Sequence, residues 1–294
     1  MKKVLTICAV VTMVLAVSGV AQATTVQGID IDFVTIGNAG NAGDTNKEAN
    51  PRGAGAVAYN YQIGKYEVTN GQWDTFVEAA GAPTGNPSDA YERSAYFTGT
   101  DLPTNGVSWY EAAQFCNYLT TGDKSLGAYQ FSGNNANPGD FEDIDRNSAI
   151  STYGMVYVIP TEDEWYKAAY YTGKGYSTYA NGTDTAPVAG VETNYWVPEN
   201  ENRHLWDFGN GTEEQNGTFD MMGNVHEWDE TVNVRGGWYY SDDYYLSSSE
   251  WITKYAQYYE GDILGFRVAV VPEPATMCLL GLGGLLLRRR KQHS

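Results

Sequence analysis

Three short motifs in the last third of the chain decide how the whole sequence is interpreted. They are Asp220-Met-Met-Gly-Asn-Val-His-Glu-Trp228, Arg235-Gly-Gly-Trp238 and Gly265-Phe-Arg267. Three further motifs precede them in the chain: Glu67-Val-Thr-Asn70, Val107-Ser-Trp109 and Pro160-Thr-Glu-Asp-Glu-Trp165. One such motif would be a weak signal, but six in a fixed order over most of the chain form a specific pattern.

In these motifs and their order, residues 30–270 resemble the formylglycine-generating enzyme (sulfatase-modifying factor) family. The resemblance implies a single α+β domain with an irregular, loop-rich fold that is distantly C-type-lectin-like. Catalytic members of that family hold copper with two cysteines placed a few residues after the Arg-Gly-Gly motif. In this chain, Ser241 and Leu246 occupy those two positions. The sequence therefore has the motifs of the family but lacks the two cysteines of its catalytic members.

The first 23 residues have the composition of a secretory signal peptide. Lys2 and Lys3 supply the positive start, an apolar run follows over 4–20, and Ala21-Gln-Ala23 is a small-x-small cleavage site. A transmembrane anchor is the alternative, but the polar sequence after the cleavage site argues against it. We therefore expect an exported protein whose domain occupies residues 24–271.

The last part of the chain, 272–294, has the order of a sorting tail. Pro272-Glu-Pro274 precedes thirteen mostly apolar residues, 275–287, and then Arg288-Arg-Arg-Lys291. Thirteen residues are fewer than the roughly 17 to 25 that span a bilayer, and a basic cluster is held on the cytoplasmic side. The pattern resembles a PEP-CTERM tail, which implies an exosortase-type processing enzyme as a partner and transient membrane contact through the tail. A plain C-terminal anchor is the alternative.

The domain between the two ends is strongly acidic. Residues 24–271 hold 12 Lys and Arg against 35 Asp and Glu, a formal net charge of −23, and Cys116 is their single cysteine. A surface of this sign repels phosphate backbones, so we expect no nucleic-acid partner. It suits divalent cations and solubility outside the cell, although a merely solvated acidic surface would have the same composition. We expect the protein in the cell envelope, on the cell surface or in an extracellular matrix.

Local signals predict three helices and three strands. Capping boxes mark the three helix starts, and they are Thr69 with Gln72, Ser108 with Glu111, and Thr161 with Glu164. Apolar residues at helical spacing follow each start, and Trp73, Trp109 and Trp165 are interpreted as core residues. Strands are predicted at 33–36, 59–63 and 155–159. Residues 37–55 are interpreted as an exposed loop and 173–217 as a long loop, which is uncommon unless functional or disordered.

The segment from Asp220 to Glu227 is the best candidate for a metal site. Calcium takes six to eight oxygen ligands and mixes carboxylates with backbone carbonyls. The family resemblance implies a structural calcium ion here, bound by the side chains of Asp220 and Glu227 and by the carbonyls of Gly223 and Val225. Two ordinary acids in a surface loop are the alternative.

A second structural calcium site is also implied by the resemblance. Its predicted ligands are the side chain of Asn194 and the carbonyl of Tyr195. Asp207 is a candidate for its distant acid, but the register of that position is not determined by the motif.

The residues after the Arg-Gly-Gly motif have the composition of a binding surface. Tyrosine and tryptophan bring large contact areas with few rotatable bonds, and Ser and Asp adapt their hydrogen bonds to a ligand. Aromatic faces also stack on sugar rings. The predicted contact residues are Trp238, Tyr239, Tyr240, Ser241, Asp242, Asp243, Tyr244, Tyr245 and Trp251. The alternative is a sheet edge whose tyrosines cover the core.

No residue is a clear candidate for a catalytic role. Copper(I) requires soft sulfur ligands, so copper is not expected with serine and leucine at the two positions. Cys116 belongs to the inward face of a predicted helix, where a thiol is inert, and His226 is interpreted as a packed loop histidine. A carboxylate pair for glycoside hydrolysis remains open because 35 acids always offer pairs.

Two functions follow from this sequence. The first is a non-catalytic, calcium-stabilised surface protein that binds a glycan or a protein through 238–251. The second is an oxidase that converts a sulfatase cysteine to formylglycine, as the catalytic relatives do. The missing cysteines, the sorting tail and the aromatic, acidic segment favour the first.

Overall fold

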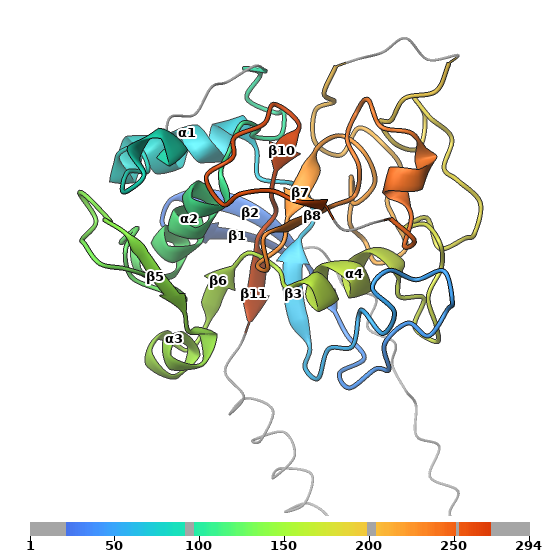
Figure 1. The fold of residues 1–294 in the computed structure, drawn as a ribbon, viewed down its shortest axis with the longest axis horizontal. Helices are drawn as coiled ribbons and strands as arrows, with labels where there is room; N and C mark the ends of the chain where they lie inside the picture. The colour runs from blue at the N-terminus through green and yellow to red at the C-terminus, as the bar shows by residue number, and fades with distance from the viewer. Residues whose placement is uncertain (1–21, 92–96, 199–203, 251–252, 272–294) are drawn as a thin grey trace, which may run out of the picture.

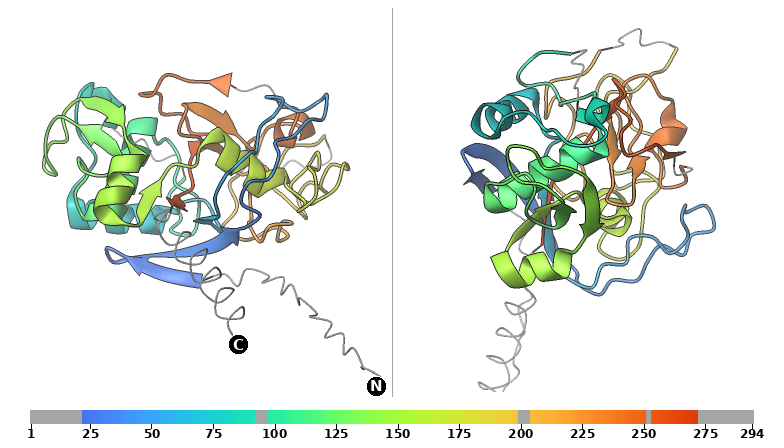
Figure 2. Two further views of the ribbon diagram at one scale, coloured as in Figure 1. Left: turned by 90° about the horizontal axis from the view of Figure 1, so that it is seen from below. Right: turned by 60° about the vertical axis from the view of Figure 1, so that its left-hand side comes forward.

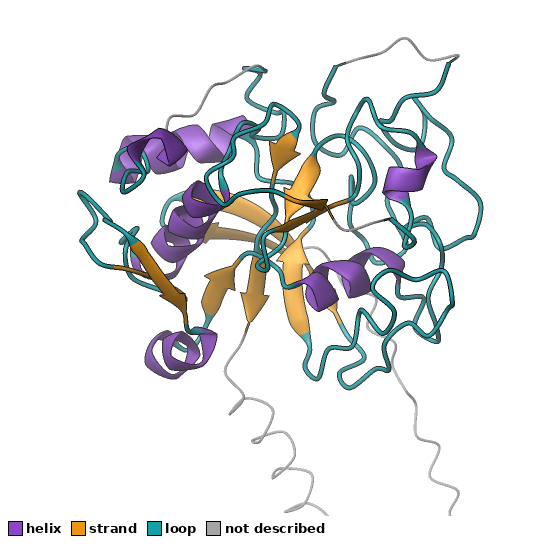
Figure 3. Cartoon of the chain, viewed as in Figure 1, coloured by secondary structure: helices purple, strands orange, loops and turns teal. Residues whose placement is uncertain are grey.

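The computed structural model describes residues 22–91, 97–198, 204–250 and 253–271, and it has a mixed α+β architecture with much loop (Figures 1 and 3). The described helices are α1 (Asn70–Ala80), α2 (Trp109–Thr121), α3 (Arg146–Tyr153) and α4 (Glu162–Tyr170), with short 3₁₀ helices at Ser88–Tyr91 and Asp243–Leu246. The predicted fold class is therefore confirmed. No helix among these residues is both long and apolar enough to cross a bilayer.

The larger sheet joins the two ends of the described chain. Its strands are β1 (Gln22–Val26), β2 (Ile29–Ile36), β3 (Tyr61–Gly64), β11 (Ala269–Val271) and β6 (Val156–Val158), in that spatial order and all antiparallel. Strand β11 lies between β3 and β6, so the last described residues form an inner strand (Figure 1). The C-terminal tail therefore begins directly after a central strand of the domain.

The smaller sheet carries the motifs that identified the family. Its order is β10 (Leu264–Gly265), β7 (His226–Trp228), β8 (Asn233–Arg235) and β9 (Thr253–Lys254). Strands β7 and β10 are parallel and the other pairs are antiparallel. Because β10 and β11 are separated by only three residues, the Gly-Phe-Arg motif connects the two sheets. A hairpin of β4 (Tyr129–Phe131) and β5 (Phe141–Ile144) stands apart from both, beside α3 (Figure 2).

The three predicted capping boxes are all present. The side chains of Thr69, Ser108 and Thr161 each accept a hydrogen bond from the backbone amide three residues later, and the Gln or Glu at that position bonds back. Gly122 ends α2 in the left-handed conformation, with φ of 79°, which glycine adopts without a steric penalty. Helices α1, α2 and α4 are thus defined by residues close to one another in sequence.

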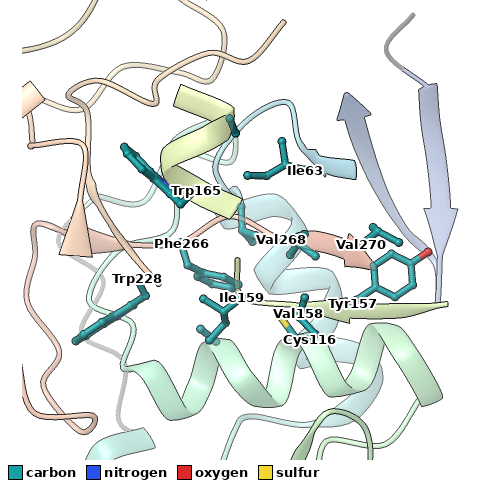
Figure 4. Packing of buried hydrophobic residues seen from close by; sticks show 14 of the residues in the cluster. Ile63, Cys116, Tyr157, Val158, Ile159, Trp165, Trp228, Phe266, Val268 and Val270 are labelled. Carbon is teal, nitrogen blue, oxygen red and sulfur yellow. The ribbon is translucent and has the colours of Figure 1, made fainter. Parts of the chain in front are cut away.

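The core fills the space between the helices and both sheets. Trp165, Phe266, Ile159 and Cys116 meet there, with the sulfur of Cys116 directed into the packing (Figure 4). The ring of Trp73 stacks on Phe115 at a centroid distance of 5.7 Å and an interplanar angle of 13°. The tryptophans predicted as core residues are therefore buried, and Cys116 is fully buried as expected.

Several local predictions were incomplete. Strand β2 begins at Ile29 rather than residue 33, and β3 begins at Tyr61 rather than residue 59. The β1 strand, the β4–β5 hairpin and α3 were not predicted. The segment 37–55 is a loop, but it is not wholly exposed, because Asp44 is buried and accepts a hydrogen bond of 2.9 Å from the hydroxyl of Tyr166. Contacts across the fold, absent from local sequence signals, bury that part of the loop.

Candidate functional site

Glu227 lies at the centre of the region where the sequence motifs meet. Its carboxylate accepts hydrogen bonds from Arg267 Nε at 2.6 Å and from Trp165 Nε1 at 2.7 Å. Arg267 Nη2 donates a further hydrogen bond to the same carboxylate. The side chains of Trp165, Glu227 and Arg267 are all fully buried. Arg267 also donates to the carbonyls of Gly64 and Phe219, each at 3.0 Å. The three motifs that carry Trp165, Glu227 and Arg267 are therefore joined by one buried ion pair and its hydrogen bonds.

Two further carboxylates lie beside this pair. Glu67 accepts hydrogen bonds from Asn224 Nδ2 at 2.9 Å and from the amide of Val225 at 3.3 Å. Burial raises the pKa of Glu67 well above its ordinary value, and the charges of Asp220 and Glu227 raise it further. Burial also raises the pKa of Asp220 to about 6, although the charge of Arg267 opposes this shift. The Arg267 guanidinium group therefore faces these three acids and the buried Glu214 as well, an arrangement with an excess of negative charge.

Whether this region can bind calcium depends on the oxygen atoms that its side chains and backbone leave available. Asp220 adopts a φ of 58°, and its carboxylate accepts a long hydrogen bond of 3.4 Å from the amide of Gly209. Glu227 shares its carboxylate with Arg267 and Trp165, so its capacity for a metal ion is limited to the remaining lone pairs. Across the described residues, no group of three or more His, Cys, Asp and Glu side chains is arranged to hold a metal ion. A cation here would depend on carbonyl and amide oxygens as well as on acids.

Asn194 supplies the clearest sign of a missing partner. It is fully buried, and its Nδ2 donates to the carbonyl of His204 at 2.9 Å and to Asn224 Oδ1 at 3.1 Å. Its Oδ1 is buried and has no hydrogen-bond partner among the residues that the structure describes, and such an atom in a native structure points to an ion or water. The predicted ligand Asn194 thus fits a cation. The next residue, Tyr195, donates a hydrogen bond from its hydroxyl to the carbonyl of Pro187. Asp207 is exposed.

The two predicted calcium segments are adjacent in space. Asn194 and Gly223 form a parallel β-bridge, and the amide of Asn224 donates to the carbonyl of Asn194 at 2.9 Å. A Cβ atom added to Gly223 would lie 2.2 Å from that carbonyl oxygen, so only glycine allows this approach. Sequence reasoning missed the link through Asn224 and Glu67, although both residues stand inside the motifs that identified the family.

The two positions that carry copper-binding cysteines in catalytic relatives converge above Gly237. A Cβ atom added to Gly237 would lie 2.7 Å from Ser241 Oγ and 2.7 Å from Leu246 Cδ2. Both side chains are buried, and Ser241 Oγ donates to the carbonyl of Trp238 at 2.9 Å. A hydroxyl and an alkyl group replace two thiolates, so the side chains at these positions do not fit copper(I).

The predicted binding segment has an inner and an outer layer. Trp238 packs on His226, with ring centroids 4.7 Å apart, and on Tyr245 at 5.1 Å. Tyr240 and Tyr244 lie outside this layer, with 42% and 40% of their surface exposed. Asp242 and Asp243 are also exposed, and Tyr239 is half-buried, whereas Ser241 is buried and directed inward. Trp251 lies outside the described residues.

The alternative of a sheet edge for this segment is wrong. Residues 238–250 contain the 3₁₀ helix at Asp243–Leu246 and no strand. The segment is instead tied to other loops by backbone bonds, because the amide of Tyr239 donates to Asn224 and the amide of Trp196 donates to Ser241, both at 2.9 Å. The outer tyrosines are therefore attached to the same segments that contain the candidate calcium ligands.

The structure adds three residues to the predicted surface. The ring of Trp196 contacts Tyr240 at a centroid distance of 5.9 Å, and Phe97 contacts Tyr239 at 5.7 Å and His204 at 6.4 Å. Three chain segments far apart in sequence thus contribute aromatic rings to one surface. No local signal marked these residues, because the contacts form only after the long loops have folded together.

His226 is packed as predicted, although it begins strand β7 rather than lying in a loop. Its Nδ1 lies 3.3 Å from the carbonyl of Arg235, and burial lowers its pKa to about 4. The imidazole is therefore neutral at physiological pH. Burial also raises the pKa of the Cys116 thiol, which keeps the thiol protonated and unreactive.

Comparison with known proteins assigns the fold and its motifs to a family. The chain belongs to the family of sulfatase-modifying factor enzyme 1-like domains, whose model matches residues 21–271. A PEP-CTERM protein-sorting motif matches residues 270–291. This motif indicates an exported, envelope-directed protein and implies recognition by an exosortase-type processing enzyme.

A curated relative and many solved structures are similar to this chain, and three of those structures are described below. A protein described as chaperone protein LppX of Paenibacillus barcinonensis is 27% identical over 183 aligned residues, which cover 57% of this chain and 61% of the relative. The chain thus spans less than two thirds of the length of that relative.

The solved structures are similar in fold alone. Treponema denticola variable protein 1 has a TM-score of 0.59 at 20% identity, and the match covers 87% of this chain and 99% of that one. CarF has a TM-score of 0.59 at 22% identity, covering 82% and 98% of the two chains. PvdO from Pseudomonas aeruginosa has a TM-score of 0.56 at 16% identity, covering 82% and 94%.

Proposed function

We propose that this protein is a non-catalytic, calcium-stabilised binding protein of the cell envelope, whose ligand is a glycan or a protein. The observation that carries the proposal is the pair Ser241 and Leu246, buried together above Gly237 where catalytic relatives hold copper. Neither side chain supplies a thiolate, so the frame of the family is retained without the ligands of its oxidase chemistry. A fold shared with enzymes does not by itself confer their activity.

The binding surface is the set of exposed and half-exposed side chains around Tyr240. Its members are Phe97, Trp196, His204, Tyr239, Tyr240, Asp242, Asp243 and Tyr244. Aromatic rings offer flat apolar faces to the C–H groups of a sugar or to apolar side chains, and the two aspartates accept hydrogen bonds from hydroxyl or amide groups. A surface of this composition recognises a ligand by stacking and by hydrogen bonds at the edge.

Calcium would act in this proposal as a structural cross-link. One ion would be held by the side chains of Asp220 and Glu227 with the carbonyls of Gly223 and Val225. A second ion would be held by Asn194 Oδ1 and the carbonyl of Tyr195. A bound cation would offset the surplus negative charge of this region and satisfy the buried oxygen of Asn194. The backbone hydrogen bonds from the amide of Tyr239 to the carbonyl of Asn224 and from the amide of Trp196 to the carbonyl of Ser241 then connect the cation sites to the binding surface.

The tail would determine where the surface is displayed. After recognition through Pro272-Glu-Pro274, the domain is either released or retained at the envelope or in an extracellular matrix. Strand β11 ends at Val271, so removal of the tail at or after Pro272 leaves this inner strand of the larger sheet intact. This arrangement suits a domain that functions after processing.

The function is tested with a glycan array and a sulfatase peptide, both in the presence of calcium. The full chain, the W196A/Y240A variant and the Y153A/Y258A control are compared; the control removes two tyrosines that are 43% and 56% exposed outside the proposed surface. We expect glycan binding by the full chain and the control, and its loss in W196A/Y240A. Equal binding by both variants would contradict the proposed surface. Conversion of the peptide cysteine to formylglycine would overturn the non-catalytic function.

A further inference from the structure

A groove that shares no lining residue with the surface around Tyr240 is formed by residues from the start of β2 and the first turn of α1. Figure 1 shows where these two elements lie in the fold. It consists of two adjoining clefts of about 190 and 290 Å³, which share Asp30, Thr69, Gln72 and Phe208. Asp32 and Tyr66 complete the first cleft. The rest of the second cleft is lined by Gly28, Ile29, Gly71, Thr75, Thr100 and Asp101. Among the residues that the structure describes, no Lys or Arg lines either cleft.

The groove combines carboxylates with aromatic rings. Phe208 is 39% exposed, and its ring lies 4.9 Å from that of Tyr66 with a tilt of 56°. Asp30 accepts a hydrogen bond of 2.5 Å from the hydroxyl of Thr25, whereas no side chain or amide of the described residues donates to the carboxylates of Asp32 and Asp101. Exposed rings flanked by carboxylates are the surroundings that ammonium and guanidinium groups favour.

The groove does not suit an anion, although it adjoins a helix N-terminus. The first amides of α1 are all occupied: Asn70 donates to Leu102 and Gly71 to Thr100, each at 2.9 Å. Gln72 and Trp73 donate to the side chain and the carbonyl of Thr69. With its backbone donors used, the groove presents acceptors and rings to a ligand.

The protein already places one ammonium group against the same aromatic cluster. Lys65 Nζ lies 5.7 Å from the centroid of the Tyr66 ring and 5.2 Å from that of Phe219, and it pairs with Glu213 at 3.0 Å. Tyr66 therefore holds a cation from its own chain, while Phe208 contributes an exposed ring to the groove. Burial raises the pKa of the Tyr66 hydroxyl, and the charge of Asp32 raises it further against the charge of Lys65.

We propose that this groove binds basic side chains, Lys or Arg, of a protein partner. The alkyl part of such a side chain packs on Phe208 and Tyr66, and its charged end reaches Asp32 or Asp101. The strongly acidic domain, with 35 acids against 12 bases in residues 24–271, attracts a basic partner at a distance and so accelerates association. The partner is thus defined by exposed Lys or Arg side chains.

The test uses a fluorescently labelled peptide of alternating Lys and Gly and the full chain in low-salt buffer. Fluorescence anisotropy should show binding that D32N/D101N weakens about tenfold, since two surface ion pairs are lost. The control E142Q/D143N removes the same charge from β5, where both residues are exposed, and should leave the affinity within about twofold of the full chain. Equal weakening by the two variants would mean non-specific attraction and would overturn the proposal.

The aromatic contribution is tested separately. F208L keeps the apolar bulk and removes the π face, so the affinity should fall about two- to fivefold, the effect of one exposed cation–π contact. The same peptide with Nε-acetylated lysines should not bind. Binding of the acetylated peptide with equal affinity, or absence of binding by the Lys peptide to the folded full chain, would overturn the proposal. Circular dichroism confirms that each variant is folded.

Discussion

Arg267 donates a hydrogen bond of 2.6 Å to the carboxylate of Glu227, although the two residues are 40 positions apart and both are fully buried. The contact joins the Gly-Phe-Arg motif to the motif of the candidate calcium segment. It also connects the two sheets, because Glu227 lies in β7 and Arg267 lies between β10 and β11. The Arg267–Glu227 ion pair is therefore the junction of the two sheets.

Breaking the buried ion pair should strongly destabilise the domain. R267M removes two of the three side-chain donors to the buried Glu227 carboxylate and the guanidinium donors to the carbonyls of Gly64 and Phe219, so we expect a loss of about 3–5 kcal/mol in the free energy of unfolding. Urea denaturation measures it. The control K65M removes a half-exposed pair with Glu213 and should cost at most about 1 kcal/mol. Similar losses in the two variants would contradict a special role for the junction.

Calcium should raise the melting temperature of the domain. At a hundredfold excess over the dissociation constant, binding to the native state adds about 2.7 kcal/mol of stability. Differential scanning fluorimetry with calcium and with chelator measures the shift. N194A and D220N should each reduce the calcium-dependent part of the shift. A melting temperature that is the same in calcium and in chelator would remove the calcium proposal.

Gly223 should not accept a side chain. Its φ is 78°, and an added Cβ would lie 2.2 Å from the carbonyl oxygen of Asn194, so G223A should cost about 2–4 kcal/mol through strain and displacement of the neighbouring loop. The control is G175A, because an added Cβ there meets no atom within 4 Å. Thermal melts measure the loss of stability in each of the two variants. Equal melting temperatures would mean that the backbone of Gly223 does not lie so close to the carbonyl oxygen of Asn194 that a side chain is excluded.

The stability of the fold should depend on Lys167 at alkaline pH. The side chain is fully buried, its Nζ donates to the carbonyl of Asn38 at 3.1 Å, and burial lowers its pKa to about 8. The unfolded chain then binds the proton more tightly than the folded one between about pH 8 and the ordinary lysine value near 10.4. Stability should therefore gain a rising contribution with pH across that window.

K167M should remove this contribution. Urea unfolding of both proteins at several pH values between about 7 and 10 measures the difference in their free energies of unfolding. We expect the difference to shift in favour of the lysine form as the pH rises. A difference that is constant across the window would show that the amine titrates normally.

The sorting tail should control the final location. Deleting residues 272–294 removes the segment matched by the PEP-CTERM motif and leaves β11 complete, so the truncated domain should fold but reach a different cell fraction. Fractionation with immunoblotting measures this, and the melting temperature of the truncated protein serves as the folding control. Identical fractionation of the truncated and full chains would refute the sorting role.

Local chemistry explains which parts of the fold could be predicted. The capping boxes at Thr69, Ser108 and Thr161 involve residues three apart, so the starts of α1, α2 and α4 are visible in the sequence. Helix α3 lacks such a box, although Asp145 caps it by accepting from the amide of Ser148. The strands of the smaller sheet contain only two or three residues each, too few for alternation to be recognised.

The candidate site was only partly predictable for a similar reason. The motif spacing nominated Asp220 and Glu227, but the engagement of Glu227 by Trp165 and Arg267 depends on contacts over 62 and 40 residues of chain. The role of Asn224 as a bridge between Glu67 and Asn194 likewise spans three separate segments. These bonds form only when the sheets and loops have come together.

The sequence by itself determined the family, the export and sorting signals, and the absence of a cysteine pair at Ser241 and Leu246, because these depend on residue types in a fixed order. Only the tertiary structure decided which rings surround Tyr240, that Asn194 Oδ1 has no hydrogen-bond partner in the described part of the chain, and that an acidic groove forms beside Phe208. Those features join segments separated by long loops. Burial and approach between such segments depend on the packing of the whole domain, which no short stretch of sequence specifies.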